Sequence, residues 1–172
     1  VVIAGGGMAG RCTAIAWRDQ GFDGELTLVC AEEHHPYDRP PLSKDVLTGK
    51  VDSSVLDTDW AALELDLHLG SAATGIDGNS LLTAGGDIGF DTLVIATGSY
   101  PLWLPGSEGL AGVHVLRTIE HSLALRSAFV AGARVVIIGA GWIGAEVATA
   151  AANANCDVTV VEAMAYPLAA AM

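Results

Sequence analysis

The stretch AGGGMAG has the G-x-G-x-x-G spacing with which a backbone can bind the pyrophosphate of a dinucleotide. Gly5 allows a tight turn, Gly7 lets the phosphates approach the backbone, and Gly10 lets a helix pack closely on a sheet. Glu32, 22 residues beyond Gly10, is the predicted acceptor for ribose hydroxyls, and Glu33 is an alternative. We therefore predict a dinucleotide site here. A tight glycine turn without a ligand is the other interpretation.

A second stretch, VVIIGAGWIGAE, repeats this spacing. Gly139, Gly141 and Gly144 follow an apolar run, and Glu162 ends the next apolar run. One dinucleotide needs one fingerprint, whereas an enzyme that passes electrons between two dinucleotides needs two. The pair therefore indicates a flavin nucleotide and a nicotinamide nucleotide. Glu162 would favour NADH over NADPH, because a carboxylate repels a 2′-phosphate and residues 163–172 contain no Arg or Lys. An ordinary strand-end charge is the alternative.

Strands and helices must position these loops, and the hydrophobic pattern predicts both. Short β-branched runs alternate with glycine turns and helical stretches, which is typical of parallel strands buried on both faces. The predicted strands are 1–4, 26–30, 93–96, 135–138 and 158–161. The predicted helices are 8–20, which stops at Gly21, 142–153, and one with Thr118 as its N-cap. The predicted fold class is α/β, with two Rossmann-like units and parallel sheets.

Two prolines and one glycine between residues 101 and 106 interrupt this pattern. We therefore place a domain boundary there. The predicted domains are an FAD-binding domain over residues 1–104 and part of an NAD(H)-binding domain over residues 105–172.

The amino-acid composition argues against several classes of binding partner. The net charge of −12 argues against nucleic acid, and no apolar run approaches the ~20 residues that span a bilayer. The three cysteines, Cys12, Cys30 and Cys156, lie far apart in apolar segments and lack metal-ligand spacing. We predict that they are small core residues, that no metal is bound, and that the protein is reduced and cytoplasmic.

Three further motifs resemble those of one family. PYDRPPLSK, residues 36–44, is similar to the signature of FAD-dependent pyridine nucleotide oxidoreductases of the ferredoxin-reductase-like branch. That branch includes rubredoxin, putidaredoxin and dioxygenase-ferredoxin reductases, and apoptosis-inducing factor. TLVIATG, residues 92–98, and LRTIE, residues 116–120, resemble segments of the same branch. The resemblance implies that the chain is the N-terminal portion of the family architecture, without the second FAD-binding segment and the C-terminal interface domain.

The resemblance also implies which residues meet the cofactors. The first unit would bind FAD and the second NADH. Two prolines would stiffen the backbone beside the flavin ring, since proline fixes φ and lacks an N–H donor. In addition to the first fingerprint, the implied FAD-binding residues are Ala9, Arg39, Pro41, Lys44, Ala73, Thr97, Gly98 and Arg117. A solvated turn is the alternative for the proline segment, and a surface salt bridge with Glu120 is the alternative for Arg117.

Three residues are the predicted catalytic group. The resemblance places Lys44 and Glu146 near the flavin N5, so we predict an ion pair between them. A cation there would favour the electron-rich reduced flavin. Trp142 would lie over the flavin face and move aside for nicotinamide, with core packing as its alternative. For Glu146 the alternative is a favourable carboxylate near a helix N-terminus.

The implied function is that of a flavoprotein reductase that passes electrons from NADH through FAD to a ferredoxin- or rubredoxin-type carrier. Two alternatives stay open. One is a redox-sensing protein of the apoptosis-inducing-factor type with slow NADH oxidation, and the other is a bare dinucleotide-binding fragment. Related disulphide reductases carry a cysteine pair soon after the first fingerprint. Residues 36–44 contain none, so thiol chemistry at the flavin is not expected.

Overall fold

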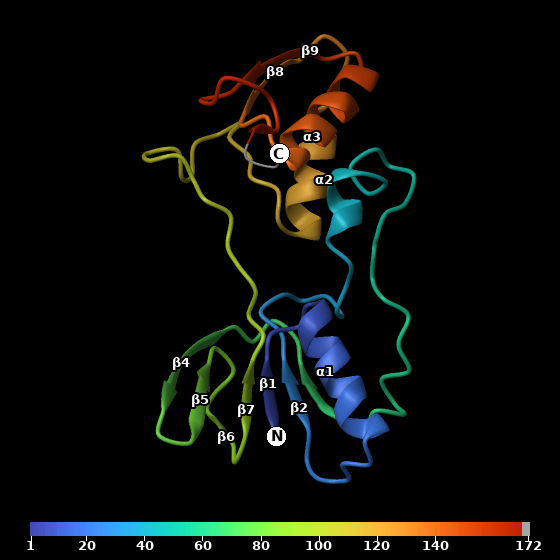
Figure 1. Ribbon diagram of the computed structural model, residues 1–172, viewed down its shortest axis with the longest axis vertical. Coiled ribbons are helices and arrows are strands. Elements are labelled where there is room, and N and C mark those ends of the chain that lie inside the picture. Colours follow the sequence, from blue (N-terminus) through green and yellow to red (C-terminus); the bar gives the residue numbers. More distant parts are fainter. Residues whose placement is uncertain (170–172) are drawn as a thin grey trace. The chain divides into compact units, whose positions relative to one another are not determined.

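The computed structural model describes residues 1–169, whose helices and strands are shown in Figure 1. By its internal contacts the chain divides into two units. The first unit combines Val1–Asp38 with Val55–Ser99, and the second combines Arg39–Ser54 with Tyr100–Met172. The segment RPPLSK therefore packs with the second unit. Residues 170–172, the end of the predicted NAD(H)-binding domain, lie outside the described residues.

The first unit is built on a four-stranded parallel sheet. Its strands, in spatial order, are β3 (Asp66–His68), β2 (Thr27–Val29), β1 (Val2–Ala4) and β7 (Leu93–Ile95). Helix α1 (Met8–Asp19) connects β1 to β2 and ends before Gly21, whose φ of +83° suits a helix stop. This β–α–β connection confirms the predicted α/β class. It also brings the carboxyl ends of β1, β2 and β7 to one edge of the sheet.

A second, antiparallel sheet belongs to the same unit. Its strands are β4 (Ala73–Asp77), β5 (Ser80–Thr83) and β6 (Ile88–Gly89), in that order. A turn through Gly78, with a φ of +54°, joins β4 to β5. This sheet and β3 were not among the predicted strands. Their segments mix polar and apolar residues, unlike the continuous apolar runs of doubly buried parallel strands.

Burial of β1 on both faces follows from these two layers. Ile3 points toward α1 and shares a buried cluster with Ala14 and Leu28. On the other face, Val2 packs in a second cluster with Leu81 of β5. Each fully buried aliphatic side chain of this kind contributes about 1.5–3 kcal/mol to folding. The short strand that precedes the first glycine loop is therefore firmly held.

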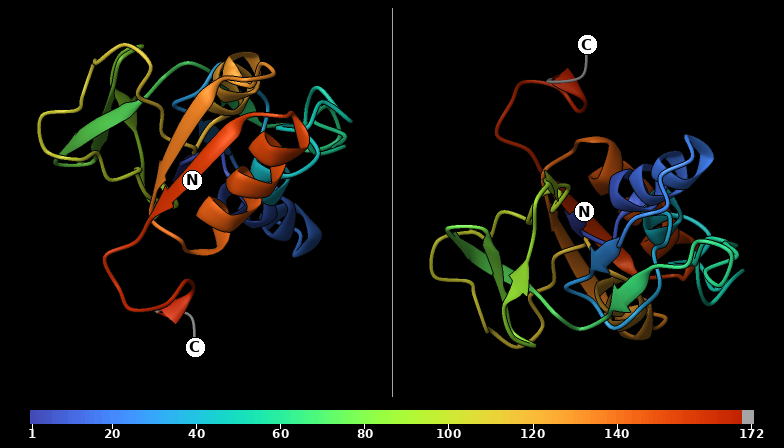
Figure 2. Two further views of the ribbon diagram at one scale, coloured as in Figure 1. Left: turned by 90° about the horizontal axis from the view of Figure 1, so that it is seen from above. Right: turned by 90° about the horizontal axis from the view of Figure 1, so that it is seen from below.

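The second unit contains helices around one strand pair. Its elements are η1 (Pro40–Ser43, a 3-10 helix), α2 (Ile119–Ala128), β8 (Arg134–Ile138), α3 (Trp142–Asn153) and β9 (Asp157–Val161). β8 and β9 pair in parallel, and α3 lies across them (Figure 2). η1 contacts both α2 and α3. Leu47, just after η1, is buried with Val147 and Ala150 of α3. Helix α3 has the predicted bounds, and Thr118 is the predicted N-cap of α2.

One prediction about the second unit is wrong. β8 and β9 were expected to be buried on both faces, but Val136 is 63% exposed and Ile138 is 61% exposed. Ile137, between them, packs with the cluster under α3. Successive strand residues point to opposite faces. Among the described residues, α3 therefore covers one face of this pair and leaves the other face open.

The cysteine prediction holds for one position and fails at another. Cys30 is buried at 2% exposure, whereas Cys12 is exposed. Gly10 and Ala14 form the buried face of α1. Cys12, two residues from each, points about 200° away from them, because each helical residue turns the chain by about 100°. All three cysteines are free within the described part of the chain. No helix in residues 1–169 is long and apolar enough to cross a membrane.

Candidate functional site

The first glycine loop is crowded by protein on one side and open at its middle. A Cβ placed on Gly5, whose φ is +126°, would lie 2.1 Å from the carbonyl oxygen of Ala96. A Cβ on Gly10 would lie 1.9 Å from the carbonyl oxygen of Gly5. By contrast, no described atom lies within 4 Å of a Cβ placed on Gly7. The first and third glycines are thus required by the fold. The second is uncrowded, which leaves room for a pyrophosphate to approach the backbone.

The helices that follow the two glycine loops begin differently from α2. Thr118 and His121 of α2 form a reciprocal capping box, so side chains satisfy the first backbone donors. α1 begins at Gly7 as its N-cap and α3 at Gly141, and no described side chain caps either helix. Their first N–H groups are therefore available to an anion, which the positive end of the helix dipole favours.

The predicted ribose acceptor of the first unit has a defined partner. Tyr37, which is buried, donates its hydroxyl proton to Glu32 Oε2 over 2.5 Å. The rival, Glu33, lies beside Gly70, with its Oε1 2.9 Å from the position of a Cβ on that glycine. Tyr37 was not among the predicted site residues. It belongs to the family-like PYDRPPLSK segment, but no spacing rule in the sequence connects it to Glu32.

Below the same loop lies Cys30. Its Sγ would be 2.2 Å from a Cβ on Gly6, so the thiol fills the space under the glycine backbone. Burial, and then the nearby charge of Glu32, raises the pKa of Cys30 to about 11. The thiol therefore stays protonated at neutral pH and acts as a packing residue, as predicted.

The second glycine loop repeats the open middle. No described atom lies within 4 Å of a Cβ on Gly141, and a Cβ on Gly144 would lie 2.0 Å from the carbonyl oxygen of Gly139. Gly139 has a φ of +102°, but nothing described crowds it. The second loop thus has the same uncrowded second glycine and the same close helix contact as the first.

Glu162 holds this second loop. Its Oε1 accepts the N–H of Met164 at 2.9 Å, and its Oε2 accepts the N–H of Ala140 at 2.7 Å. These backbone donors, Met164 first and Ala140 second, lower the pKa of Glu162 below the ordinary 4.5 of a glutamate. Leu168 adds a third contact, because its N–H donates to the Ala140 carbonyl at 2.9 Å. The predicted ribose acceptor is therefore an ionised group that touches the glycine loop itself.

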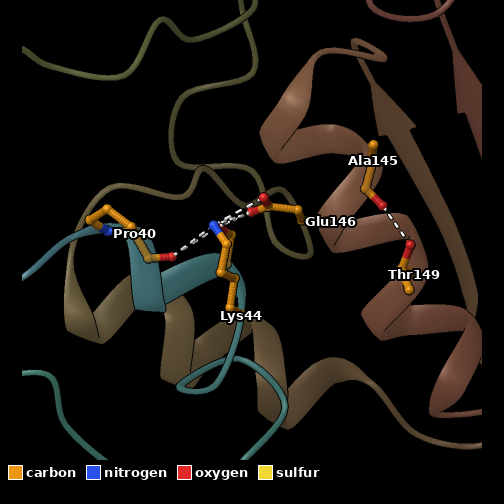
Figure 3. Close-up of polar contacts among 6 residues, drawn as sticks. Pro40, Lys44, Ala145, Glu146 and Thr149 are labelled. Atoms are coloured by element: carbon orange, nitrogen blue, oxygen red, sulfur yellow. Dashed lines mark hydrogen bonds and ion pairs between the residues drawn. The ribbon is translucent and has the colours of Figure 1, made fainter.

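Pro40 and Lys44 of the proline segment form a polar cluster with Glu146 of α3 (Figure 3). The predicted ion pair is present: Lys44 Nζ lies 3.0 Å from each carboxylate oxygen of Glu146. The Lys44 side chain is 51% exposed and that of Glu146 is 30% exposed. Lys44 also approaches the Pro40 carbonyl at 3.4 Å. Ser43, which was not predicted, donates its hydroxyl proton to Glu146 Oε2 over 2.5 Å.

The hydrogen bonds to Glu146 set its charge. The Ser43 hydroxyl is the largest influence, and it lowers the pKa of Glu146 below the ordinary 4.5. Partial burial opposes this effect, and Lys44 reinforces it through its hydrogen bond and its charge. The carboxylate and the ammonium therefore form a fixed pair of opposite charges at neutral pH.

The other site residues predicted in the second unit include Arg39, Arg117, Trp142 and Pro41. Arg39 donates to the carbonyl of Arg117 at 2.6 Å. The Nε of Arg117 is buried and has no hydrogen-bond partner among the described residues, which leaves a donor for an anion. Trp142 is 65% exposed, so its core-packing alternative is wrong. Pro41 is the second residue of η1, in the first turn, where a proline's missing N–H is tolerated.

The remaining predicted residues of the first unit lie in three places. Thr97 and Gly98 follow β7, directly after the Ala96 that contacts Gly5. Ala9 is exposed in the first turn of α1. Ala73 begins β4 and packs against the cluster that contains Val2. Roles of these residues in cofactor binding stay predictions.

With this geometry in place, comparison with known proteins identifies the family. The sequence profile described as pyridine nucleotide-disulphide oxidoreductase matches residues 1–172. The chain belongs to this family. Its relatives include the ferredoxin–NAD(+) reductase component of the p-cumate 2,3-dioxygenase system of Pseudomonas putida. That protein is 41% identical over 170 residues, which are 95% of this chain and 42% of the relative.

Solved structures give the same result. The crystal structure of Fdr9 superposes with a TM-score of 0.93 at 47% identity, over 99% of this chain and 43% of that chain. The putidaredoxin reductase in a covalent complex with putidaredoxin gives a TM-score of 0.91 at 36% identity, over 98% of this chain and 43% of that chain. The chain thus spans less than half the length of these relatives. The names of the p-cumate 2,3-dioxygenase system component and of putidaredoxin reductase agree with the reductase branch that the PYDRPPLSK segment predicted.

The three cysteines are all free within the described part of the chain. Cys30 follows β2 and is buried and protonated, and Cys12 is exposed on α1. The polar group next to the proline segment is a serine and a lysine with a glutamate, not a cysteine pair.

Proposed function

We propose that this chain is the dinucleotide-binding part of a flavoprotein reductase that uses NADH and FAD to reduce a ferredoxin- or rubredoxin-type carrier. One observation carries the proposal. Two loops in one chain have an open second glycine and a helix start that no described side chain caps. Both are features of a pyrophosphate site, and two such sites suit transfer between two dinucleotides.

The first loop fits FAD by its chemistry. Gly7 leaves room for the pyrophosphate, the N–H groups of α1 would bind it, and Glu32 would accept ribose hydroxyls. In the second unit, the buried Nε of Arg117, which has no hydrogen-bond partner among the described residues, is a donor suited to an anionic group. Bound FAD would supply the step from a two-electron hydride donor to a one-electron carrier.

The second loop fits NADH. Gly141 leaves the corresponding room, and Glu162 is ionised, which disfavours a 2′-phosphate. Residues 163–172 contain no Arg or Lys that could neutralise such a phosphate. We therefore propose a preference for NADH over NADPH.

Lys44, Glu146 and Trp142 would complete the reactive region. Lys44 would hold a positive charge where reduction adds electron density, and Glu146 would keep that charge in place. Trp142, with 65% exposure, is free to stack on a flat ring and to move aside. The partner is inferred from the relatives, which are named as reductases of ferredoxins and of putidaredoxin. We also place the protein in the cytoplasm, since its three free cysteines suit a reducing compartment.

The experiment uses the purified chain with added FAD under anaerobic conditions. NADH should bleach the flavin absorption band, NADPH should do so at least about tenfold less efficiently, and a ferredoxin-type protein should then be reduced. Gly7→Ala should weaken flavin binding at least about tenfold. Gly89→Ala is the matched control, because no described atom crowds that glycine either and it lies outside the loop. Full flavin occupancy in Gly7→Ala, or equal rates with both nicotinamide nucleotides, would contradict the proposal.

A further inference from the structure

The carboxylate of Glu146 is contacted by two consecutive residues of the proline segment. Ser43 Oγ lies 2.5 Å from Oε2, and Lys44 Nζ lies 3.0 Å from both oxygens. Neighbouring side chains of a 3-10 helix point about 120° apart. Lys44 reaches the same carboxylate as Ser43 because it lies just after η1, with a non-helical φ of −120° and ψ of −105°.

The backbone around Ser43 is fixed independently of Glu146. Ser122 of α2 is fully buried and donates to the carbonyl of Leu42 at 2.6 Å. On the α3 side, Val147 is buried against Leu47. The turn and the helix are therefore held at a set distance by these contacts. The Ser43–Glu146 hydrogen bond adds orientation to a separation that is already defined.

The Ser43 hydroxyl has one proton and a clear choice of acceptor. Glu146 Oε2 is 2.5 Å away, whereas the Pro40 carbonyl is 3.4 Å away. Ser43 is buried at 7% exposure, so water competes little for this proton. A hydrogen bond to an ionised acceptor is among the stronger kinds in proteins.

We propose that Ser43 is a positioning residue whose hydroxyl orients the Glu146 carboxylate, so that the Lys44 ammonium is held between that carboxylate and the Pro40 carbonyl. Lys44 is half exposed, and a long side chain in an exposed ion pair is usually mobile. Ser43 provides the buried contact that Lys44 lacks. The Ser43–Glu146–Lys44 arrangement rests on the structure alone; only its use for flavin rests on the proposed function.

Other charged groups near this cluster have partners of their own. Asp45, the next residue, pairs with Lys50 at 3.0 Å. On α2, Arg126 bonds to the Val46 carbonyl and to Asp52. The remaining ionisable residues of α2 are His121, which takes part in the capping box, and Glu120, which is exposed. Glu146 is the one ionisable residue of α3. Its titration should therefore report mainly on Ser43 and Lys44.

The test is NMR on the cofactor-free chain with labelled glutamate carboxyls and labelled lysine. The sequence has only two lysines, so Lys50 is an internal control for Lys44, and Glu146→Gln assigns the Glu146 signal. In Ser43→Ala the pKa of Glu146 should rise toward the ordinary value, and the Lys44 side chain should become as mobile as that of Lys50. Ser43→Thr, which keeps the hydroxyl, should restore both. Ser127→Ala should change neither, because that exposed serine bonds only within α2, to the Ala124 carbonyl.

A wild-type measurement covers the case in which Ser43→Ala does not fold. The Ser43 hydroxyl proton should give a slowly exchanging, downfield signal that disappears as Glu146 is protonated at acid pH. An unchanged Glu146 pKa and an unchanged Lys44 mobility in folded Ser43→Ala would overturn the proposal. So would a rapidly exchanging hydroxyl in the wild type. With FAD bound, the acid limb of flavin reduction should move to higher pH in Ser43→Ala. Absence of any flavin reduction would refute the proposed function and leave the NMR result standing.

Discussion

The two glycine loops have the same surroundings at their second and third glycines and different surroundings at their first glycine. At the third glycine the helix meets the loop closely in both cases, with Cβ-to-oxygen distances of 1.9 Å at Gly10 and 2.0 Å at Gly144. The second glycines are open in both. The first glycines differ, because a Cβ placed on Gly5 would lie 2.1 Å from the Ala96 carbonyl oxygen, whereas no described atom lies within 4 Å of a Cβ placed on Gly139.

This difference separates the contacts that lie within the glycine loop and its helix from the contacts that neighbouring segments add. The third-glycine contact lies inside the loop–helix unit, so both copies have it. The first-glycine contact comes from the residue after β7, and β8 has no described neighbour in the corresponding place. Instead, the second loop is held by Glu162 and by Leu168. Packing supports the first loop, and a charged side chain supports the second.

The largest expected effect comes from the same substitution at the first glycine of each loop. Gly5→Ala forces a Cβ against backbone in addition to a left-handed φ, so it should destabilise the first unit by at least about 4 kcal/mol. Gly139→Ala introduces the strained φ but no clash with the backbone, so it should lower the free energy of unfolding by about 1–3 kcal/mol. Urea unfolding followed by the signals of the four fluorine-labelled tryptophans, two in each unit, measures both. Equal losses of stability in the two variants would contradict the difference in packing around Gly5 and Gly139.

A smaller effect should follow from removing the charge that supports the second loop. Because the pKa of Glu162 is lowered by folding, its hydrogen bonds are present above the ordinary value and are lost as pH falls through the lowered pKa. The Ala140 amide signal should therefore titrate at acid pH, and Glu162→Gln should remove that titration. Glu108→Gln, at an exposed position of the same unit, is the control. A titration that persists in Glu162→Gln would show that another group supports the loop.

The smallest effect concerns the thiols near the first loop. With a pKa of about 11, Cys30 should be about one part in a thousand thiolate at pH 8, and it is buried as well. Cys12 is exposed on α1. A maleimide should therefore label Cys12 and spare Cys30 until the chain unfolds, as mass spectrometry of digests can show. Labelling of both at similar rates would mean that the packing under Gly6 is loose.

The sequence was sufficient where a constraint is local. Helix α3 begins and ends as predicted, because the glycine fingerprint sets its start and the apolar pattern its length. The Lys44–Glu146 pair was also predicted, but only through the family-like PYDRPPLSK segment, since 102 residues separate the two. Spacing alone gives no reason to join them.

The sequence was not sufficient where contacts depend on tertiary packing. Ser43 and Ser122 are ordinary serines in the sequence, and their roles come from burial beside Glu146 and Leu42. The exposed face of β8 was missed because apolar runs look alike whether one or both faces are covered. Tyr37 was missed for the same kind of reason, since its bond to Glu32 depends on the turn between them.

The most direct test of the two-loop account is a crossed titration. Wild type, Gly7→Ala and Gly141→Ala are each titrated with FAD and with NADH by calorimetry, after unfolding curves show that both variants keep the wild-type stability. The open surroundings of these glycines predict that neither substitution disturbs the fold. Gly7→Ala should weaken FAD at least about tenfold and leave NADH unchanged, and Gly141→Ala should do the reverse. If one substitution weakens both ligands equally, or if neither changes any affinity, the assignment of one dinucleotide to each loop is wrong.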